Sequence, residues 1–170
     1  LALSQPFQSV VAAQQTRSER QETSNQRQLQ EANRLDEQIE KLYLEAKYEA
    51  AIKLAQQSLE IRKRNLPSDD LLLAESLHNL VVLYLAVSNY TKAEPLLRQS
   101  LNIREQKLGK EDLLVASSLN ALGGLYQGVG NYETAGTLFK RALAIRQAKL
   151  SPTHGLIVQS MNNLALLYQK

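Results

Sequence analysis

The sequence of 170 residues has no cysteine and no tryptophan, and it has only seven glycines and four prolines. The lack of cysteine excludes a disulfide framework, a thiolate metal site and a cysteine nucleophile. It leaves the redox compartment open, because a chain without cysteine suits either side of a membrane. No apolar run approaches the roughly 20 residues that a membrane-spanning helix needs. We therefore expect no membrane insertion.

A strong excess of one charge is also missing. The formal net charge is +3, from 20 Lys and Arg against 17 Asp and Glu. Nucleic-acid-binding proteins carry a concentrated basic patch, so we expect no nucleic-acid partner. The recurrent bases Arg62, Arg104 and Arg146 are interpreted as part of a solvated outer face.

Residue constellations that carry chemistry are absent too. His78 and His154 are far apart and have no paired carboxylate at ligand spacing, so we expect neither a metal nor a cofactor. The glycines from Gly123 to Gly130 are not followed by the Gly-Lys-Ser/Thr of a phosphate loop. No serine lies in a nucleophile elbow. The sequence therefore predicts a protein without enzymatic activity.

What the chain does contain is a repeat marked by its seven tyrosines. One series is spaced by 41, 42 and 42 residues, and the other by 42 and 42: Tyr43, Tyr84, Tyr126 and Tyr168; Tyr48, Tyr90 and Tyr132. The first unit is interpreted as one residue shorter between its tyrosines than the others. A unit of this length cannot bury its apolar face alone, so copies of it must stack.

The repeat divides the chain into a leader at 1–32 and an array at 33–170. We expect repeats at 33–74, 75–116 and 117–158, and a partial fourth repeat, a lone helix, at 159–170. In the second repeat, helix A is expected over 71–87 after an Asp70 cap, and helix B over 90–108 after an Asn89 cap. Asp112 and Asn131 are the corresponding caps of the third repeat.

The leader is unusually polar. Residues 14–28 contain no large apolar side chain, which favours a solvated helix or a frayed segment, held by docking of Phe7, Val10 and Val11. Residues 1–13 suit the end of a secretory signal cleaved before Gln14, and they equally suit an arbitrary start that caps the first helix. The absence of an initiator Met favours a fragment or a processed product. Localisation is left open between cytoplasmic and exported.

The third repeat carries the most specific motif. It reads Leu119-x-x-Leu122-Gly123-x-x-Tyr126, followed by Ala135-x-x-x-Phe139 and Ala142. This resembles the tetratricopeptide repeat (TPR) pattern, with Leu in place of its Trp. The period of 42 is similar to that of the kinesin-light-chain subclass, and 161–169 resembles its bacterial members. The resemblance implies an all-α TPR solenoid, a right-handed superhelix of antiparallel helix pairs.

The resemblance also implies a concave ligand groove lined by helix A of each repeat. The positions expected to line it are Arg34, Glu37, Lys41, Glu75, His78, Asn79, Val82, Asn120, Gly124, Gln127, Gly128, Asn162, Asn163 and Leu166. The amides among them either grip the backbone of an extended peptide or simply close the superhelix as solvated polar residues. Because the groove lacks the Lys and Arg cluster with which family members clamp a terminal carboxylate, we expect no chaperone C-terminal tail as ligand.

Gly124 and Gly128 lie one helical turn apart on one face. Each costs about 1 kcal/mol of helix stability relative to Ala. They either leave a bare patch for a bulky ligand side chain or permit closer packing of a neighbouring helix.

These observations predict a non-enzymatic adaptor or scaffold that binds a peptide segment of a partner protein. The alternative is a self-association or regulatory module of a larger signalling protein whose effector domain is absent from this chain. Such a homodimer would form through the open face of the C-terminal helix, where Leu164 and Leu167 are expected to lie uncovered.

Overall fold

The structure is a computed structural model that describes the backbone of residues 5–169 and the side chains of residue 10 and residues 14–169. The secretory remnant expected at 1–13 and the docking of Phe7 and Val11 therefore fall outside the described residues and side chains. The described range forms the following helices: α1 (Gln5–Leu44), α2 (Tyr48–Asn65), α3 (Leu71–Ala86), α4 (Tyr90–Leu108), α5 (Leu113–Gly128), α6 (Tyr132–Lys149) and α7 (Gly155–Leu167).

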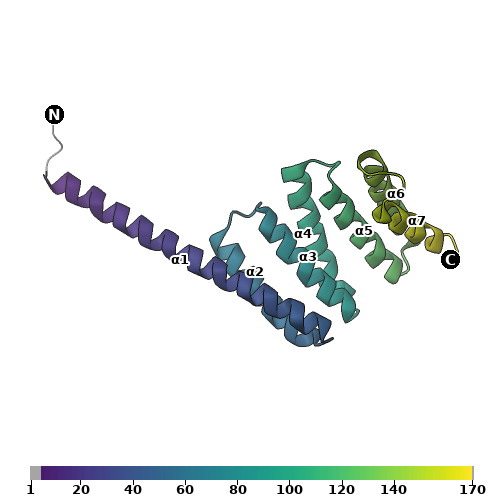
Figure 1. The fold of residues 1–170 in the computed structure, drawn as a ribbon, viewed down its shortest axis with the longest axis horizontal. Coiled ribbons are helices and arrows are strands. Elements are labelled where there is room, and N and C mark those ends of the chain that lie inside the picture. Colours follow the sequence, from purple (N-terminus) through teal and green to yellow (C-terminus); the bar gives the residue numbers. More distant parts are fainter. Residues whose placement is uncertain (1–4, 170) are drawn as a thin grey trace.

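The helices stack as antiparallel pairs along one direction (Figure 1). Helix A of each repeat is α1, α3, α5 or α7, and helix B is α2, α4 or α6. Within each of the three repeats the two helices pack on each other, and each helix B also packs on helix A of the next repeat. This is the all-α solenoid that the repeat predicts, and it is built from the expected segments: α4 has the predicted bounds, and α3 ends one residue before the predicted end.

Side-chain caps set where the helices of the second and third repeats begin. Asp70 Oδ1 accepts a hydrogen bond from the Leu72 amide at 2.8 Å, and Asp112 Oδ1 accepts one from Leu114 at 2.7 Å. Asn89 and Asn131 cap α4 and α6 in the same way. A cap of this kind satisfies an amide that has no partner inside the helix. All four caps were predicted from the sequence.

The first repeat has the same length as the others, which corrects the sequence interpretation. At the turn of each repeat an amide donates to the carbonyl five residues earlier: Lys47 to Leu42, Asn89 to Tyr84, and Asn131 to Tyr126. The turn residue with positive φ follows the same spacing of 42: Ala46, Ser88 and Gly130. Leu42 therefore occupies the tyrosine column, and Tyr43 lies one position beyond it. Tyr43 is accordingly 41% exposed, whereas Tyr84 is 5% exposed.

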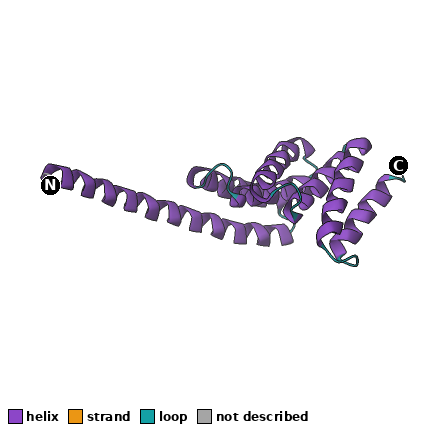
Figure 2. Ribbon diagram, turned by 90° about the horizontal axis from the view of Figure 1, so that it is seen from above, coloured by secondary structure: helices purple, strands orange, loops and turns teal. Residues whose placement is uncertain are grey.

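The leader and the first helix A form one continuous helix, α1. Asn65 Nδ2, at the end of α2, donates to Gln28 Oε1 at 2.8 Å. Residues 5–27 extend away from the array (Figures 1 and 2), over about 35 Å at 1.5 Å per residue. Residues 14–28 are therefore helical and mostly exposed rather than frayed. Of the helices in the described range, none is both long and apolar enough to span a bilayer.

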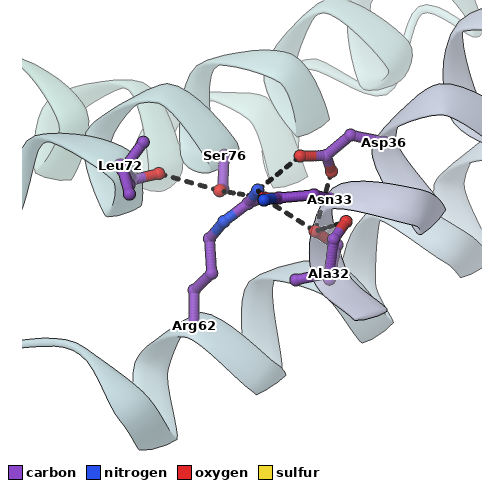
Figure 3. Close-up of polar contacts among 7 residues, drawn as sticks. Ala32, Asn33, Asp36, Arg62, Leu72 and Ser76 are labelled. Atoms are coloured by element: carbon purple, nitrogen blue, oxygen red, sulfur yellow. Dashed lines mark hydrogen bonds and ion pairs between the residues drawn. The ribbon is translucent and has the colours of Figure 1, made fainter. Parts of the chain in front are cut away.

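Buried arginines connect successive repeats, which corrects their assignment to the outer face. Arg62, Arg104 and Arg146 are each at most 6% exposed. Each donates from Nη1 to a serine of the next helix A, at 2.9, 2.7 and 2.7 Å: Ser76, Ser118 and Ser160. Figure 3 shows the first of these contacts, where Arg62 reaches from α2 to Ser76 on α3 and Asp36 on α1.

The three arginines differ in how their charge is compensated. Arg62 Nη2 lies 2.5 Å from Asp36 Oδ2. Arg104 and Arg146 instead donate to the backbone carbonyls of Leu114 and Leu156. Burial lowers the pKa of both of these guanidinium groups, since a charge removed from water is destabilised unless it is paired. All three contacts between repeats are therefore hydrogen bonds from an arginine to an uncharged serine, and the first arginine also has an ionic partner within its own repeat.

Candidate functional site: the helix A face

The uniform period of 42 determines which residues of helix A share a column. The aligned positions are Asp36, His78, Asn120 and Asn162; Glu37, Asn79, Ala121 and Asn163; and Glu40, Val82, Gly124 and Leu166. Arg34 and Lys41 lie outside these columns, and Arg34 pairs with Glu31 on the exposed side of α1 at 3.7 Å. They were placed in the groove by the Tyr43 register, which is off by one residue. Asp36 and Glu40 were missed for the same reason.

A hollow of about 400 Å³ lies between α1 and α3. Ile39, Tyr43, Val82 and Leu83 contribute its apolar lining, and its polar lining comes from four carboxylates and one amide: Asp36, Glu37, Glu40, Glu75 and Asn79. Four residues predicted for the groove from the sequence, Glu37, Glu75, Asn79 and Val82, come together here. The lining contains no basic side chain.

The four carboxylates of the hollow are not equivalent. Asp36 accepts hydrogen bonds from Ser58 Oγ at 2.8 Å and from Arg62, so its charge is compensated. Glu75 lies in the field of Arg104, whose pKa it helps to raise against the effect of burial. Glu37 and Glu40 are exposed, and no hydrogen bond or ion pair in the described part of the chain uses their side chains. These two carry the uncompensated negative charge.

The acidic character of the helix A face does not continue at His78. It occupies the column of Asp36, one repeat later, and it is partly buried. Its Nδ1 atom is buried and has no hydrogen-bond partner. Burial, and secondarily the charge of Arg104, lower the pKa of His78 to about 4. The imidazole is therefore neutral at neutral pH, and it adds no charge to the groove.

Two of the predicted amides bind each other. Asn163 Nδ2 on α7 donates to Asn120 Oδ1 on α5 at 2.9 Å. This bond joins neighbouring A helices and uses part of the hydrogen-bonding capacity of both side chains. Asn79 and Asn162 are exposed. The predicted amide column therefore divides into a pair that closes the superhelix and two side chains that remain accessible.

The predicted glycines also divide. A Cβ atom added at Gly124 would meet nothing within 4 Å, whereas one at Gly128 would lie 3.1 Å from the ring of Tyr90. Gly128 therefore permits close packing, and Gly124 leaves open space on α5. Gln127 is partly buried, and Leu166 on α7 is 54% exposed.

The open face of α7 differs from the one expected. Leu164 and Leu167 are only 9% and 7% exposed, because they pack on α6 around Phe139. Val158 and Met161 are the large apolar side chains of α7 that are exposed although their equivalents on α3 and α5 are buried, and Tyr168, the residue that follows α7, is also exposed. On α5 the equivalents of the first two, Ala116 and Leu119, are buried in the core.

No metal-binding cluster is present in the part of the chain that the structure describes: no group of three or more His, Cys, Asp or Glu side chains is placed to hold an ion. The carboxylates between α1 and α3 are thus spread along a groove wall. Their arrangement suits contact with an extended ligand rather than coordination of one ion.

Comparison with known proteins identifies the repeat. The family model of the tetratricopeptide repeat matches residues 42–106 and 114–170, which together make up most of the chain. Curated protein sequences gave no match. The solved structure of BtubC (BKLC) from P. vanneervenii is 25% identical with a TM-score of 0.68, and the match covers 73% of this chain and 50% of that one.

Two further structures bear on the type of repeat. A Podospora anserina kinesin light chain protein with nearly identical TPR-like repeats is 26% identical, with a TM-score of 0.75, and the match covers 81% of this chain and 65% of that one. The first TPR of Spaghetti (RPAP3), bound to the HSP90 peptide SRMEEVD, is 16% identical with a TM-score of 0.60, and the match covers 82% and 92%. That last likeness concerns the fold alone.

The chain spans half to about two thirds of the length of the kinesin-light-chain-like structures that it matches. The shared architecture is that of a protein-interaction module. This chain belongs to the tetratricopeptide repeat family and is of its kinesin-light-chain-like type.

Proposed function

We propose that the chain is a non-enzymatic adaptor that binds an extended peptide segment of a partner protein along its helix A face, starting in the hollow between α1 and α3. The observation that carries the proposal is the convergence of Glu37, Asn79 and Val82 on one hollow of about 400 Å³. An apolar lining with a few polar groups around it is typical of ligand sites. The Kd should be micromolar in order of magnitude, because ordering the peptide offsets much of the contact energy.

The individual side chains suit an extended peptide. Asn79 presents a donor and an acceptor at the edge of the hollow, which is what a peptide backbone requires. Val82 and Tyr43 offer partly exposed apolar surface to a side chain. Further along the face, Gly124 leaves room for the peptide to continue across α5.

Charge argues against an acidic tail as ligand. The HSP90 peptide SRMEEVD bound to Spaghetti ends in an acidic segment. In this chain, the same type of ligand would face Glu37, Glu40 and Glu75 rather than a basic clamp. The proposal therefore retains the prediction against chaperone tails.

The test is selection from a random dodecapeptide library displayed on phage, followed by anisotropy titration of the enriched peptides. Val82→Arg places a long side chain in the hollow, and Val129→Arg makes the same change outside it, at an exposed turn position. We expect Val82→Arg to weaken binding at least about ten-fold, and Val129→Arg to leave it within two-fold. Circular dichroism melting of both variants confirms that they fold.

Two results would contradict the proposal. One is that no peptide is enriched over the library background. The other is that the enriched peptides bind Val82→Arg as tightly as they bind the unsubstituted chain, which would place their site elsewhere.

Self-association through α7 is a second candidate, favoured by the exposure of Met161 (53%) and Tyr168 (70%). Sedimentation equilibrium over a hundred-fold concentration range tests it. A mass that rises with concentration and returns to that of a monomer in Met161→Glu would support this candidate. A constant monomer mass would remove it.

A further inference from the structure

We infer that the hollow between α1 and α3 selects a basic residue, a Lys or Arg of the bound peptide, whose stem lies on Tyr43 and Val82 and whose cation lies among Glu37, Glu40 and Glu75. The inference rests on the proposed peptide groove and specifies the chemistry of its first section.

The first argument is the local sign of the charge. The chain carries a formal net charge of +3, yet the lining of this hollow contains four carboxylates and no base. Asp36 is compensated by Arg62, and Glu75 is partly compensated by Arg104. Glu37 and Glu40 have no such partner among the described residues. A ligand that neutralises these two must bring its own positive charge.

The second argument is the spacing of the two free carboxylates. Glu37 and Glu40 are three residues apart on α1, so they lie one turn apart on one face. Glu75 faces the same hollow from α3. Like charges at this spacing destabilise a helix, and a cation placed between the two helices would relieve that repulsion. The free groove thus holds an unfavourable arrangement that a basic ligand would remove.

The third argument is the position of Tyr43. Tyr84, Tyr126 and Tyr168 each have a base over the ring, at 5.6 to 5.8 Å from the centroid. Within the described residues, no base lies over Tyr43, whose ring packs edge-on against Tyr48 at 5.6 Å. Tyr43 is displaced by one position into the hollow. An incoming Lys or Arg could therefore place its stem along apolar surface and its charge near an aromatic face.

The rest of the helix A face limits the preference to one end of the peptide. His78 is neutral in the next repeat, and the Asn120–Asn163 pair follows it. The peptide should accordingly carry its basic residue where it meets α1 and α3, and neutral residues where it crosses α5.

The test uses the peptides enriched in the library selection. We expect Lys or Arg at one recurrent position, and we expect replacement of that residue by Gln in the synthetic peptide to weaken binding about ten-fold, as the loss of several partly exposed charge contacts predicts. The triple variant Glu37→Gln, Glu40→Gln, Glu75→Gln should bind the Gln peptide and the basic peptide equally. The affinity of the unsubstituted chain for the basic peptide should also fall as salt rises.

The matched control is the triple variant Glu49→Gln, Glu111→Gln, Glu133→Gln. It makes the same change in net charge at three exposed carboxylates that do not line the hollow. We expect its preference for the basic peptide to remain within two-fold of the unsubstituted value. If both triple variants lose the preference equally, net charge rather than the hollow is responsible, and the inference is overturned.

The outcomes separate this inference from the proposed function. If the enriched peptides lack a recurrent basic residue but bind the Val82→Arg variant more weakly, the basic preference is overturned and the groove proposal remains intact. If the enriched peptides bind the Val82→Arg variant as tightly as the unsubstituted chain, or if no peptide is enriched, both the groove proposal and the basic preference are overturned.

Discussion

The two ends of the helix A face are built on the same columns and differ in almost every interaction. Between α1 and α3, Asp36 pairs with the buried Arg62, and the carboxylates beside it line an open hollow. Between α5 and α7, the equivalent residue Asn120 has no charge and binds Asn163 across the gap. One end is acidic and open, and the other is neutral and bridged.

This difference separates what the repeat fixes from what it leaves free. The spacing of 42 places a side chain at the same point of every helix A, where Asp36 pairs with Arg62 and His78 feels the charge of Arg104. The identity of this side chain determines whether a nearby arginine has a counter-ion and whether neighbouring A helices are joined by a hydrogen bond. It also determines the sign of the charge on that part of the helix A face. We therefore propose that ligand preference varies at these positions, because the packing sets their location but does not set which side chain occupies them.

The largest effect should come from removing the counter-ion at the open end. Asp36→Ala leaves Arg62, which is 5% exposed, without its charge partner. Breaking a buried ion pair costs about 3–5 kcal/mol; because the Asp36 side chain is itself 35% exposed, we expect a loss nearer about 2–3 kcal/mol in urea unfolding. Asp36→Asn, which introduces the residue found at position 120, should cost less. Equal losses for the two variants would contradict the ionic account.

The next effect concerns pH and the column residue between the two ends. The folded pKa of His78 is lowered to about 4, chiefly by burial, from 6.5, so the unfolded chain binds more protons between these values. The stability from His78 is therefore complete above about pH 6.5 and is lost as pH falls towards 4. At pH 5 the loss should be about 1–2 kcal/mol. Urea unfolding at pH 7 and pH 5 should show this loss, and His78→Asn should lack it; an equal loss in His78→Asn would contradict the assignment.

Adjacent glycines on α5 provide a matched pair at the other end. A Cβ atom at Gly123 would lie 2.6 Å from Phe139, whereas one at Gly124 would meet nothing within 4 Å. We expect Gly123→Ala to destabilise the chain by about 1–3 kcal/mol through overpacking. Gly124→Ala should stabilise it by up to about 1 kcal/mol through helix propensity. Thermal melting distinguishes the two variants. Destabilisation by Gly124→Ala would contradict the open space assigned beside Gly124 on α5.

The smallest effect should come from the amide bridge. Asn163→Ala removes one neutral hydrogen bond to Asn120, worth about 0.5–1.5 kcal/mol. Asn162→Ala, one residue earlier and exposed, serves as its control and should change stability by less than about 0.5 kcal/mol. If urea unfolding gave the two variants the same stability, the bridge would not contribute to closing α7 on α5.

The sequence predicted the architecture well, because periodicity and caps are local properties. The four caps and the bounds of α4 follow from short-range rules. The 41-residue spacing of Tyr43 and Tyr84 misled the prediction by one position. The 42-residue spacing of Tyr48 and Tyr90 carried the correct register, and following it would have identified Asp36 and Glu40 as groove residues.

Burial of charge was harder to predict from sequence. Arg62, Arg104 and Arg146 repeat among other bases on helix B, and only the structure shows that they point inward to serines on the next helix. Likewise, Leu164 and Leu167 were expected to be uncovered, but α6 buries them. Both cases depend on which face of a helix meets a neighbouring repeat, and the recurrence of single residues does not specify that face.

The central claim is that ligands bind the helix A face at its open, acidic end. The most direct measurement is a ¹⁵N–¹H correlation titration of the chain with an enriched peptide. We predict the largest shifts at the amides of Glu37, Asn79 and Val82, with little change along the outer helices α2 and α4. Shifts concentrated on those outer helices, or on the exposed face of α7 around Met161, would contradict the account.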